Sequence, residues 1–161
     1  MSRRPQVSAS VEIDAPAELV WAVLTDFGRY PDWNPFNVGM KTTFEMGAPV
    51  FMDVALVGNR TQRQTEYITA LEPGRKVCWS MNRPPAWLIG ATRCQILVAL
   101  DAGRTRYTSN DAITGVLAPV VMLVYGRAMQ RGFESVCTAL KQRAERMATT
   151  PPNEAAEPDG S

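Results

Sequence analysis

Hydrophobic and polar positions alternate at the start of the chain and then change to a helical spacing. Residues 7–13 alternate between apolar and polar side chains, which predicts a half-buried strand. Residues 17–27 carry apolar side chains at helical spacing, and Pro16 before them suits the first turn of a helix. A short aromatic segment with two prolines follows at residues 29–36. The pattern therefore predicts one strand followed by two short helices.

The middle of the chain has the pattern of a sheet. Between residues 37 and 115, apolar alternation is broken repeatedly by glycine and proline turns, as is typical of antiparallel strands joined by tight connections. This pattern predicts six further strands, near residues 38–46, 50–56, 61–71, 77–81, 94–100 and 107–113.

The last predicted element is one long helix over residues 117–147. Apolar side chains recur along it every three or four residues, while its first two turns are apolar on nearly every side. We therefore expect an α+β fold in which a curved, seven-stranded antiparallel sheet wraps around the C-terminal helix. Residues 1–148 are predicted to form one domain. Residues 149–161 are acidic and rich in proline, and we expect them to be a disordered tail.

The composition excludes several chemistries. The 161 residues contain no histidine, so a Ser-His-Asp triad, a His-ligated metal and a histidine base are all impossible. The net charge is +1, which gives no electrostatic reason to expect nucleic acid as a partner. Without clustered oxygen ligands, a glycine-rich phosphate motif or a paired-cysteine motif, we expect no metal and no cofactor.

The cysteines and the apolar runs bear on localisation. The three cysteines are widely spaced and lie in apolar stretches, so we expect them to be free thiols in a reducing, cytoplasmic setting. The N-terminus has no apolar signal region, and the longest apolar run, residues 116–125, is too short to span a membrane.

A family resemblance covers about residues 5–147. The segment VEIDAPAELVWAVLTDFGRYPDWNPF resembles the opening of START-like (SRPBCC) proteins, which have the helix-grip fold, and is most similar to their bacterial polyketide cyclase/dehydrase branch. The turn at Pro73-Gly74 and the strand containing Trp79 fit as well. The resemblance implies a ligand cavity between the long helix and the sheet. Many relatives carry a histidine near Ser109 and another near Cys94, and this chain has neither.

Alternation suggests which residues line that cavity. We expect inward-facing strand residues, aromatic residues at the cavity mouth and the apolar start of the last helix to contact a ligand. These candidates are Trp33, Asn34, Phe36, Met52, Val54, Trp79, Met81, Cys94, Ile96, Tyr107, Ser109, Asp111, Leu117, Val121 and Val124.

Asp111 and Tyr107 are the candidate catalytic residues. Burial would raise the pKa of Asp111 and make it a possible general acid or base. The alternative is an ion pair with a cross-strand arginine, Arg93, if the inward face of its strand is shifted by one residue. Asp53 and Glu66 are another possible polar contact, although their spacing does not establish it.

Three functions remain open. The first is binding of a small apolar or aromatic, lipid- or polyketide-like molecule. The second is a polyketide cyclase or dehydratase that uses Asp111 or Tyr107. The third is a co-chaperone-like or self-associating module that presents residues 84–89 and 116–125 as an apolar patch. The sequence is compatible with a monomer or a homodimer.

Overall fold

The computed structural model describes residues 6–57 and 60–150, and its elements follow the predicted order. The strands are β1 (Gln6–Ile13), β2 (Asn37–Lys41), β3 (Pro49–Val57), β4 (Arg60–Glu72), β5 (Lys76–Ser80), β6 (Gly90–Asp101) and β7 (Arg104–Thr114). The helices are α1 (Ala17–Thr25), the 3-10 turn η1 (Phe27–Arg29), α2 (Tyr30–Trp33) and α3 (Ala118–Thr149). Residues 151–161, which make up most of the predicted tail, lie outside the described part of the chain.

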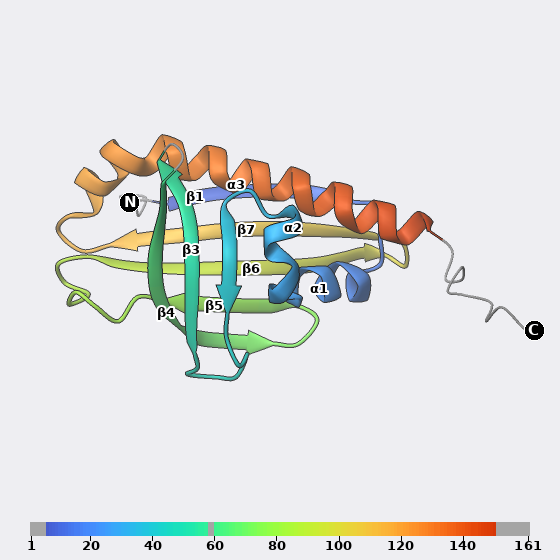
Figure 1. Cartoon of the computed structure of the whole chain (residues 1–161), viewed down its shortest axis with the longest axis horizontal. Helices are drawn as coiled ribbons and strands as arrows, with labels where there is room; N and C mark the ends of the chain where they lie inside the picture. Colours follow the sequence, from blue (N-terminus) through green and yellow to red (C-terminus); the bar gives the residue numbers. More distant parts are fainter. Residues whose placement is uncertain (1–5, 58–59, 151–161) are drawn as a thin grey trace, which may run out of the picture.

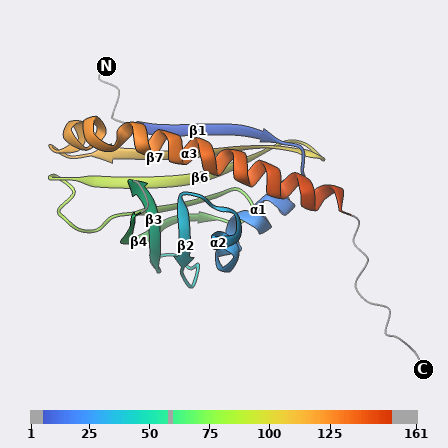
Figure 2. The same ribbon diagram turned by 45° about the horizontal axis from the view of Figure 1, so that its top comes forward.

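The seven strands form one antiparallel sheet in the order β1-β7-β6-β5-β4-β3-β2. The sheet twists so strongly that β2, β3 and β4 cross the long axis along which β1, β7 and β6 run (Figure 1). Helix α3 lies on the concave side, along β1 and β7 (Figure 2). This is the predicted helix-grip fold. Because the sheet curls away from a straight helix, the two diverge toward the start of α3.

A side-chain turn directs the chain from α2 into the sheet. The Asn34 Oδ1 atom accepts hydrogen bonds from the backbone N–H groups of Phe36 at 3.1 Å and Asn37 at 2.8 Å. Asparagine favours such turns because its short side chain reaches the backbone two or three residues ahead. The turn brings the Phe36 ring against α3, where its centroid lies 5.6 Å from that of Phe133.

The predicted inward face of β6 is wrong by one residue. Arg93 lies opposite Asp111 and Gln95 lies opposite Ser109 in the β6–β7 register. Directly opposed residues point to the same side of an antiparallel sheet, so Arg93 and Gln95 face inward with β7. Cys94 and Ile96 therefore lie on the other face and cannot line an internal cavity. The run from Cys94 to Leu100 is apolar on both faces, so its alternation alone could not settle the choice.

The prediction of three free cysteines is also wrong for two of them. Cys78 on β5 and Cys94 on β6 lie opposite each other in the sheet and form a disulfide, with their Cα atoms 4.1 Å apart. Cys137 is a buried free thiol. The pairing depends on strand register, which cannot be read from two cysteines 16 residues apart. The inference of a reducing compartment therefore loses its support.

Gly115 joins the sheet to the long helix at a close backbone approach. Its φ is +90°, and a Cβ atom there would lie 2.6 Å from the Leu88 carbonyl carbon and oxygen. Only glycine fits such a position without strain. Directly after Gly115, the N–H of Val116 donates to the Trp87 carbonyl and that of Leu117 to the Leu88 carbonyl, both at 3.0 Å. The β5–β6 loop is thus attached to the start of α3.

Candidate ligand-binding cavity

A cavity of about 380 Å³ occupies the space where α3 and the sheet diverge. Most of the residues that line it are apolar. These apolar residues come mainly from β3, the β5–β6 loop and α3. The apolar residues include Val54, Leu56, Met81, Ile89, Val121 and Met129. Its outer end reaches the exposed side chains of Gln62 and Arg83. This volume lies within the range of about 300–1,000 Å³ that is usual for small-molecule sites.

Arg93 closes the inner end of the cavity. Its guanidinium carbon lies 5.2 Å from the ring centroid of Phe36 and 4.7 Å from that of Phe133, so the cation is held between two aromatic rings. Its Nη2 atom lies 3.5 Å from Asp111 Oδ2, and its Nη1 atom lies 3.4 Å from Asn37 Oδ1. The three side chains of Phe36, Arg93 and Phe133 form a plug across the interior.

Behind the plug the interior is nearly filled. The remaining void is about 10 Å³, no more than the space of one water molecule, and it is lined by Asn34, Tyr107 and Ser109 among others. The Tyr107 hydroxyl donates a hydrogen bond to Gln95 Oε1. Burial raises the pKa of Tyr107. Tyr107 is therefore a neutral, already bonded group that does not reach the large cavity.

Asp111 reaches the cavity as one member of an ion pair. Burial raises its pKa, and the charge and hydrogen bond of Arg93 oppose that change. Its Oδ1 atom is buried without a hydrogen-bond partner among the described residues. The ion pair is the alternative that the sequence offered for Asp111, and it depends on the shifted face of β6.

Glu66 is the other acidic side chain that lines the cavity. It projects inward from β4 and is only 5% exposed, and its Oε2 atom has no hydrogen-bond partner in the described part of the chain. Burial raises the pKa of Glu66 to about 7, with Arg93 lowering it and Asp111 raising it. Asp53, its suggested partner, instead faces Arg63, with 3.3 Å between Arg63 Nε and Asp53 Oδ1. That suggested contact is therefore wrong.

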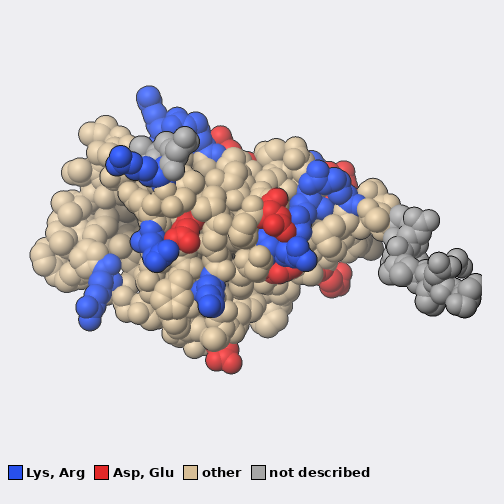
Figure 3. All heavy atoms as spheres, viewed as in Figure 1, with Lys and Arg blue, Asp and Glu red and all other residues tan. Residues whose placement is uncertain are grey.

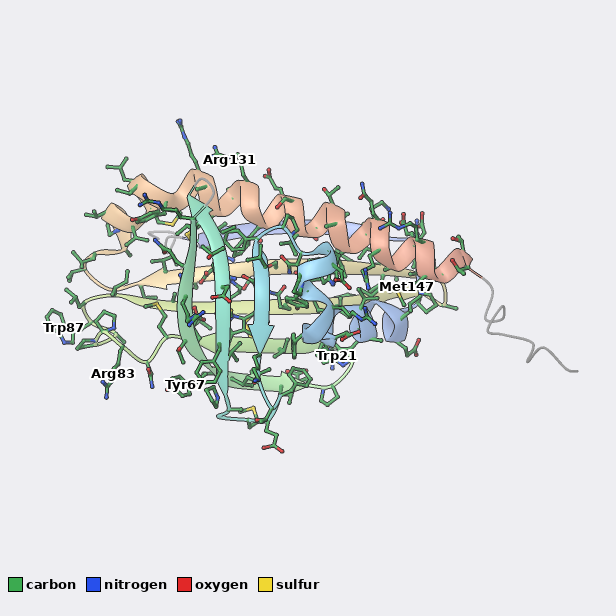
Figure 4. The ribbon with its side chains drawn as sticks, in the orientation of Figure 1. Trp21, Tyr67, Arg83, Trp87, Arg131 and Met147 are labelled. Atoms are coloured by element: carbon green, nitrogen blue, oxygen red, sulfur yellow. A yellow bond between two sulfur atoms is a disulfide. The ribbon has the colours of Figure 1, made fainter. Side chains whose placement is uncertain are left out.

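The start of α3 and the β5–β6 loop form an apolar surface at the same end of the molecule. Trp87 is 70% exposed and Leu123 is 86% exposed. Figure 4 shows Trp87 and Arg83 projecting from the loop at this end, and Figure 3 shows mostly uncharged surface there. Leu117 and Val124 were expected in the cavity but are 40% and 61% exposed, and neither lines it.

The fifteen predicted site residues thus fall into several places. Those that line the cavity are Phe36, Val54, Met81, Asp111 and Val121. Asn34, Tyr107 and Ser109 lie behind the plug, and Phe36 borders both spaces. Trp33, Met52 and Trp79 line neither space; Met52 and Trp79 lie in the core, and Trp33 is partly buried against it. The ligand-binding role of the cavity residues remains a prediction.

The most informative residues were those that sequence reasoning did not select. Arg93 and Gln95 were missed because the apolar run of β6 hid its inward face. Gln62, Gln64 and Glu66 alternate along β4, yet a polar strand is usually interpreted as a solvent-facing one. No sequence signal marks the inward face of β4, because residues 61–66 are polar at every position, and Thr65 lines the cavity together with Gln64 and Glu66.

Comparison with protein families identifies the class. Residues 4–145 match the family described as polyketide cyclase / dehydrase and lipid transport, and the chain therefore belongs to this family. A search of curated protein sequences finds no match.

Solved structures share the fold at low sequence identity. The Zhui aromatase/cyclase from Streptomyces sp. R1128 is 22% identical with a TM-score of 0.69, covering 88% of this chain and 93% of that one. A START superfamily protein from Mycobacterium smegmatis is 20% identical with a TM-score of 0.67, covering 88% and 98%. The di-domain ARO/CYC StfQ from the steffimycin biosynthetic pathway is 14% identical with a TM-score of 0.69, covering 91% of this chain and 52% of that one.

Two further searches concern metals and membranes. Within residues 6–57 and 60–150, no three acidic or cysteine side chains come together as a possible metal site. Among the helices described, none has the length and apolar character needed to cross a membrane.

Proposed function

We propose that this protein binds a small, mostly apolar or aromatic molecule in the cavity between α3 and the sheet. The observation that carries the proposal is the 380 Å³ cavity itself, with its mostly apolar lining, its polar residues on β4 and the Arg93–Asp111 ion pair at its inner end. Burial of apolar surface contributes about 25 cal/mol per Å², so enclosing 200 Å² of a ligand would contribute roughly 5 kcal/mol before the cost of association. The few polar groups would then orient the ligand.

The test combines a ligand panel with a variant that fills the cavity. Fatty acids, sterols and aromatic polyketides are titrated while the melting temperature and the heat of binding are measured. Val121→Trp introduces an indole into the cavity, and we expect it to abolish binding. Leu123→Trp places the same side chain on the exposed side of the same helix and should leave binding unchanged. If no compound raises the melting temperature, or if Val121→Trp binds as well as the wild type, the proposal is wrong.

A second candidate function is that of a cyclase or dehydratase, and Glu66 is the observation that favours it. A cavity carboxyl group with a pKa near 7 suits general acid-base catalysis at neutral pH. Asp111 is less suited because it is paired with Arg93, and Tyr107 because it lies behind the plug. In an aldol-type cyclisation, ionised Glu66 would take a proton from the attacking carbon, the new C–C bond would form as the carbonyl π bond opens, and protonated Glu66 would return that proton to the carbonyl oxygen. Turnover of a poly-keto substrate should then fall at least about 100-fold in Glu66→Gln. Full turnover in both Glu66→Gln and Asp111→Asn would exclude these carboxyl groups from the mechanism.

A further inference from the structure

The wall of the cavity that β4 forms is polar, while most of the other lining residues are apolar. Gln62, Gln64, Thr65 and Glu66 line it from β4, and alternate residues of a strand such as Gln64 and Glu66 are about 6.7 Å apart. Val121 and Tyr125 line it from α3, which β3 reaches at this end of the molecule (Figure 1). A ligand between the two walls therefore needs one polar edge and one apolar face.

The polar wall ends at Glu66, and no cation within residues 6–57 and 60–150 forms an ion pair with its carboxyl group. Arg93 on β6 is the buried cation nearest the inner end, and it is already paired with Asp111 on β7. The other titratable or charged side chains that line the cavity are Arg83, which is exposed at the outer end, and Tyr125. An ionised carboxylate in such a place would be buried and unpaired, at a cost that protonation avoids. Protonated Glu66 has one O–H to donate.

We propose that the ligand is an uncharged amphiphile with its oxygen-bearing edge along β4, and that Glu66 donates a hydrogen bond to one of its carbonyl oxygens. This inference rests on the proposed binding function and names the class of ligand. A ligand carboxylate at the inner end would instead place a third acidic group beside Glu66 and Asp111, with only Arg93 to balance them. Carboxylates such as fatty acids are therefore disfavoured there.

Three probes of nearly equal size test the inference. 2-Acetylnaphthalene offers a carbonyl oxygen, 2-ethylnaphthalene lacks it, and 2-naphthoate carries a full negative charge. Dissociation constants are measured at pH 5.5 and pH 8.5, on either side of the Glu66 pKa of about 7. The quantity of interest is the affinity of the ketone relative to that of the ethyl compound, because this ratio cancels the shared apolar contribution.

The expected result is a pH-dependent preference for the ketone. In the wild type the ratio should be roughly 2- to 10-fold higher at pH 5.5 than at pH 8.5, as expected for one neutral hydrogen bond. Glu66→Gln keeps a donor at every pH, so its ratio should not change with pH. Glu66→Leu has no donor, and its ratio should be low at both values. Glu72→Gln changes an exposed carboxyl group on the same strand and should behave as the wild type.

Two results would overturn the inference while the binding function stands. One is a wild-type ratio that does not change between the two pH values and equals the ratio of Glu66→Leu. The other is binding of 2-naphthoate as tight as that of the ketone. If neither the naphthalene probes nor the panel of lipids and polyketides binds, the proposed function itself is wrong and the inference falls with it.

Discussion

Replacing Glu66 by glutamine should change how the stability of the protein depends on pH. Burial raises the pKa of Glu66 from its usual 4.5 to about 7 in the folded state. The folded state then binds more protons than the unfolded state between these two values, so stability falls as pH rises through this window. At about 1.4 kcal/mol per pKa unit, the wild type should lose about 3 kcal/mol of unfolding free energy between pH 4.5 and pH 7 from this group alone. Glutamine has nearly the same shape and no charge, so Glu66→Gln should not show this loss.

The measurement is urea denaturation of wild type and variant at several pH values from 4.5 to 8. The difference in unfolding free energy between the two proteins isolates Glu66, because Asp111, whose pKa burial also raises, is present in both. That difference should shift by about 3 kcal/mol in favour of Glu66→Gln as the pH rises from 4.5 to 8. Glu72→Gln, at an exposed position of β4, should show no such shift. If the difference between wild type and Glu66→Gln is the same at every pH, Glu66 is not a buried, unpaired acid.

Three further predictions concern the plug, the long helix and the exposed surface. Arg93→Met leaves Asp111 buried without its cation and should lower the unfolding free energy by about 3–5 kcal/mol at pH 7. Adding Asp111→Asn should reduce this loss, because the buried charge is then removed as well. If the effects of the two substitutions simply add, Arg93 and Asp111 are not energetically coupled. Gly132→Ala improves helix propensity by about 1 kcal/mol but places a Cβ atom 2.2 Å from the Phe36 ring, so thermal unfolding should show a net loss of about 1–2 kcal/mol rather than a gain. Leu123→Glu, at an 86% exposed position, should change the unfolding free energy by less than about 0.5 kcal/mol. If the loss is larger in a sample that light scattering shows to be monomeric, Leu123 is buried in solution.

Much of the fold could be predicted because local patterns determine it. Alternation in β3 and β7 placed Val54 and Asp111 on the inward face, and the 3- and 4-residue spacing of α3 placed Phe133 toward the sheet. Alternation and helical spacing are visible in the sequence because one face of each element is buried and the other is solvated. Where both faces are apolar, as in β6, the pattern carries no such information.

The cavity could be predicted only as a region. Leu117 and Val124 belong to a helix end that is apolar on nearly every side, and such an end was expected to be covered. It is instead largely exposed, and only Val121 of the three candidates on α3 turns into the cavity. Which side of the helix faces inward depends on the angle between α3 and the sheet, a property that no local window of sequence contains.

The sequence by itself determined the family, the order of the elements and the absence of histidine chemistry, because each follows from residue types and their spacing along the chain. The tertiary structure decided which polar groups meet. Arg93 comes to lie between Phe36 and Phe133 and beside Asp111, while Glu66 has no ion-pair partner in the part of the chain that the structure describes. These contacts join residues up to 57 positions apart along the chain, and they depend on strand register and on how far the sheet curls from α3. A shift of one residue in a strand reverses every side chain on it, so chemistry at the cavity could be assigned only once that register was known.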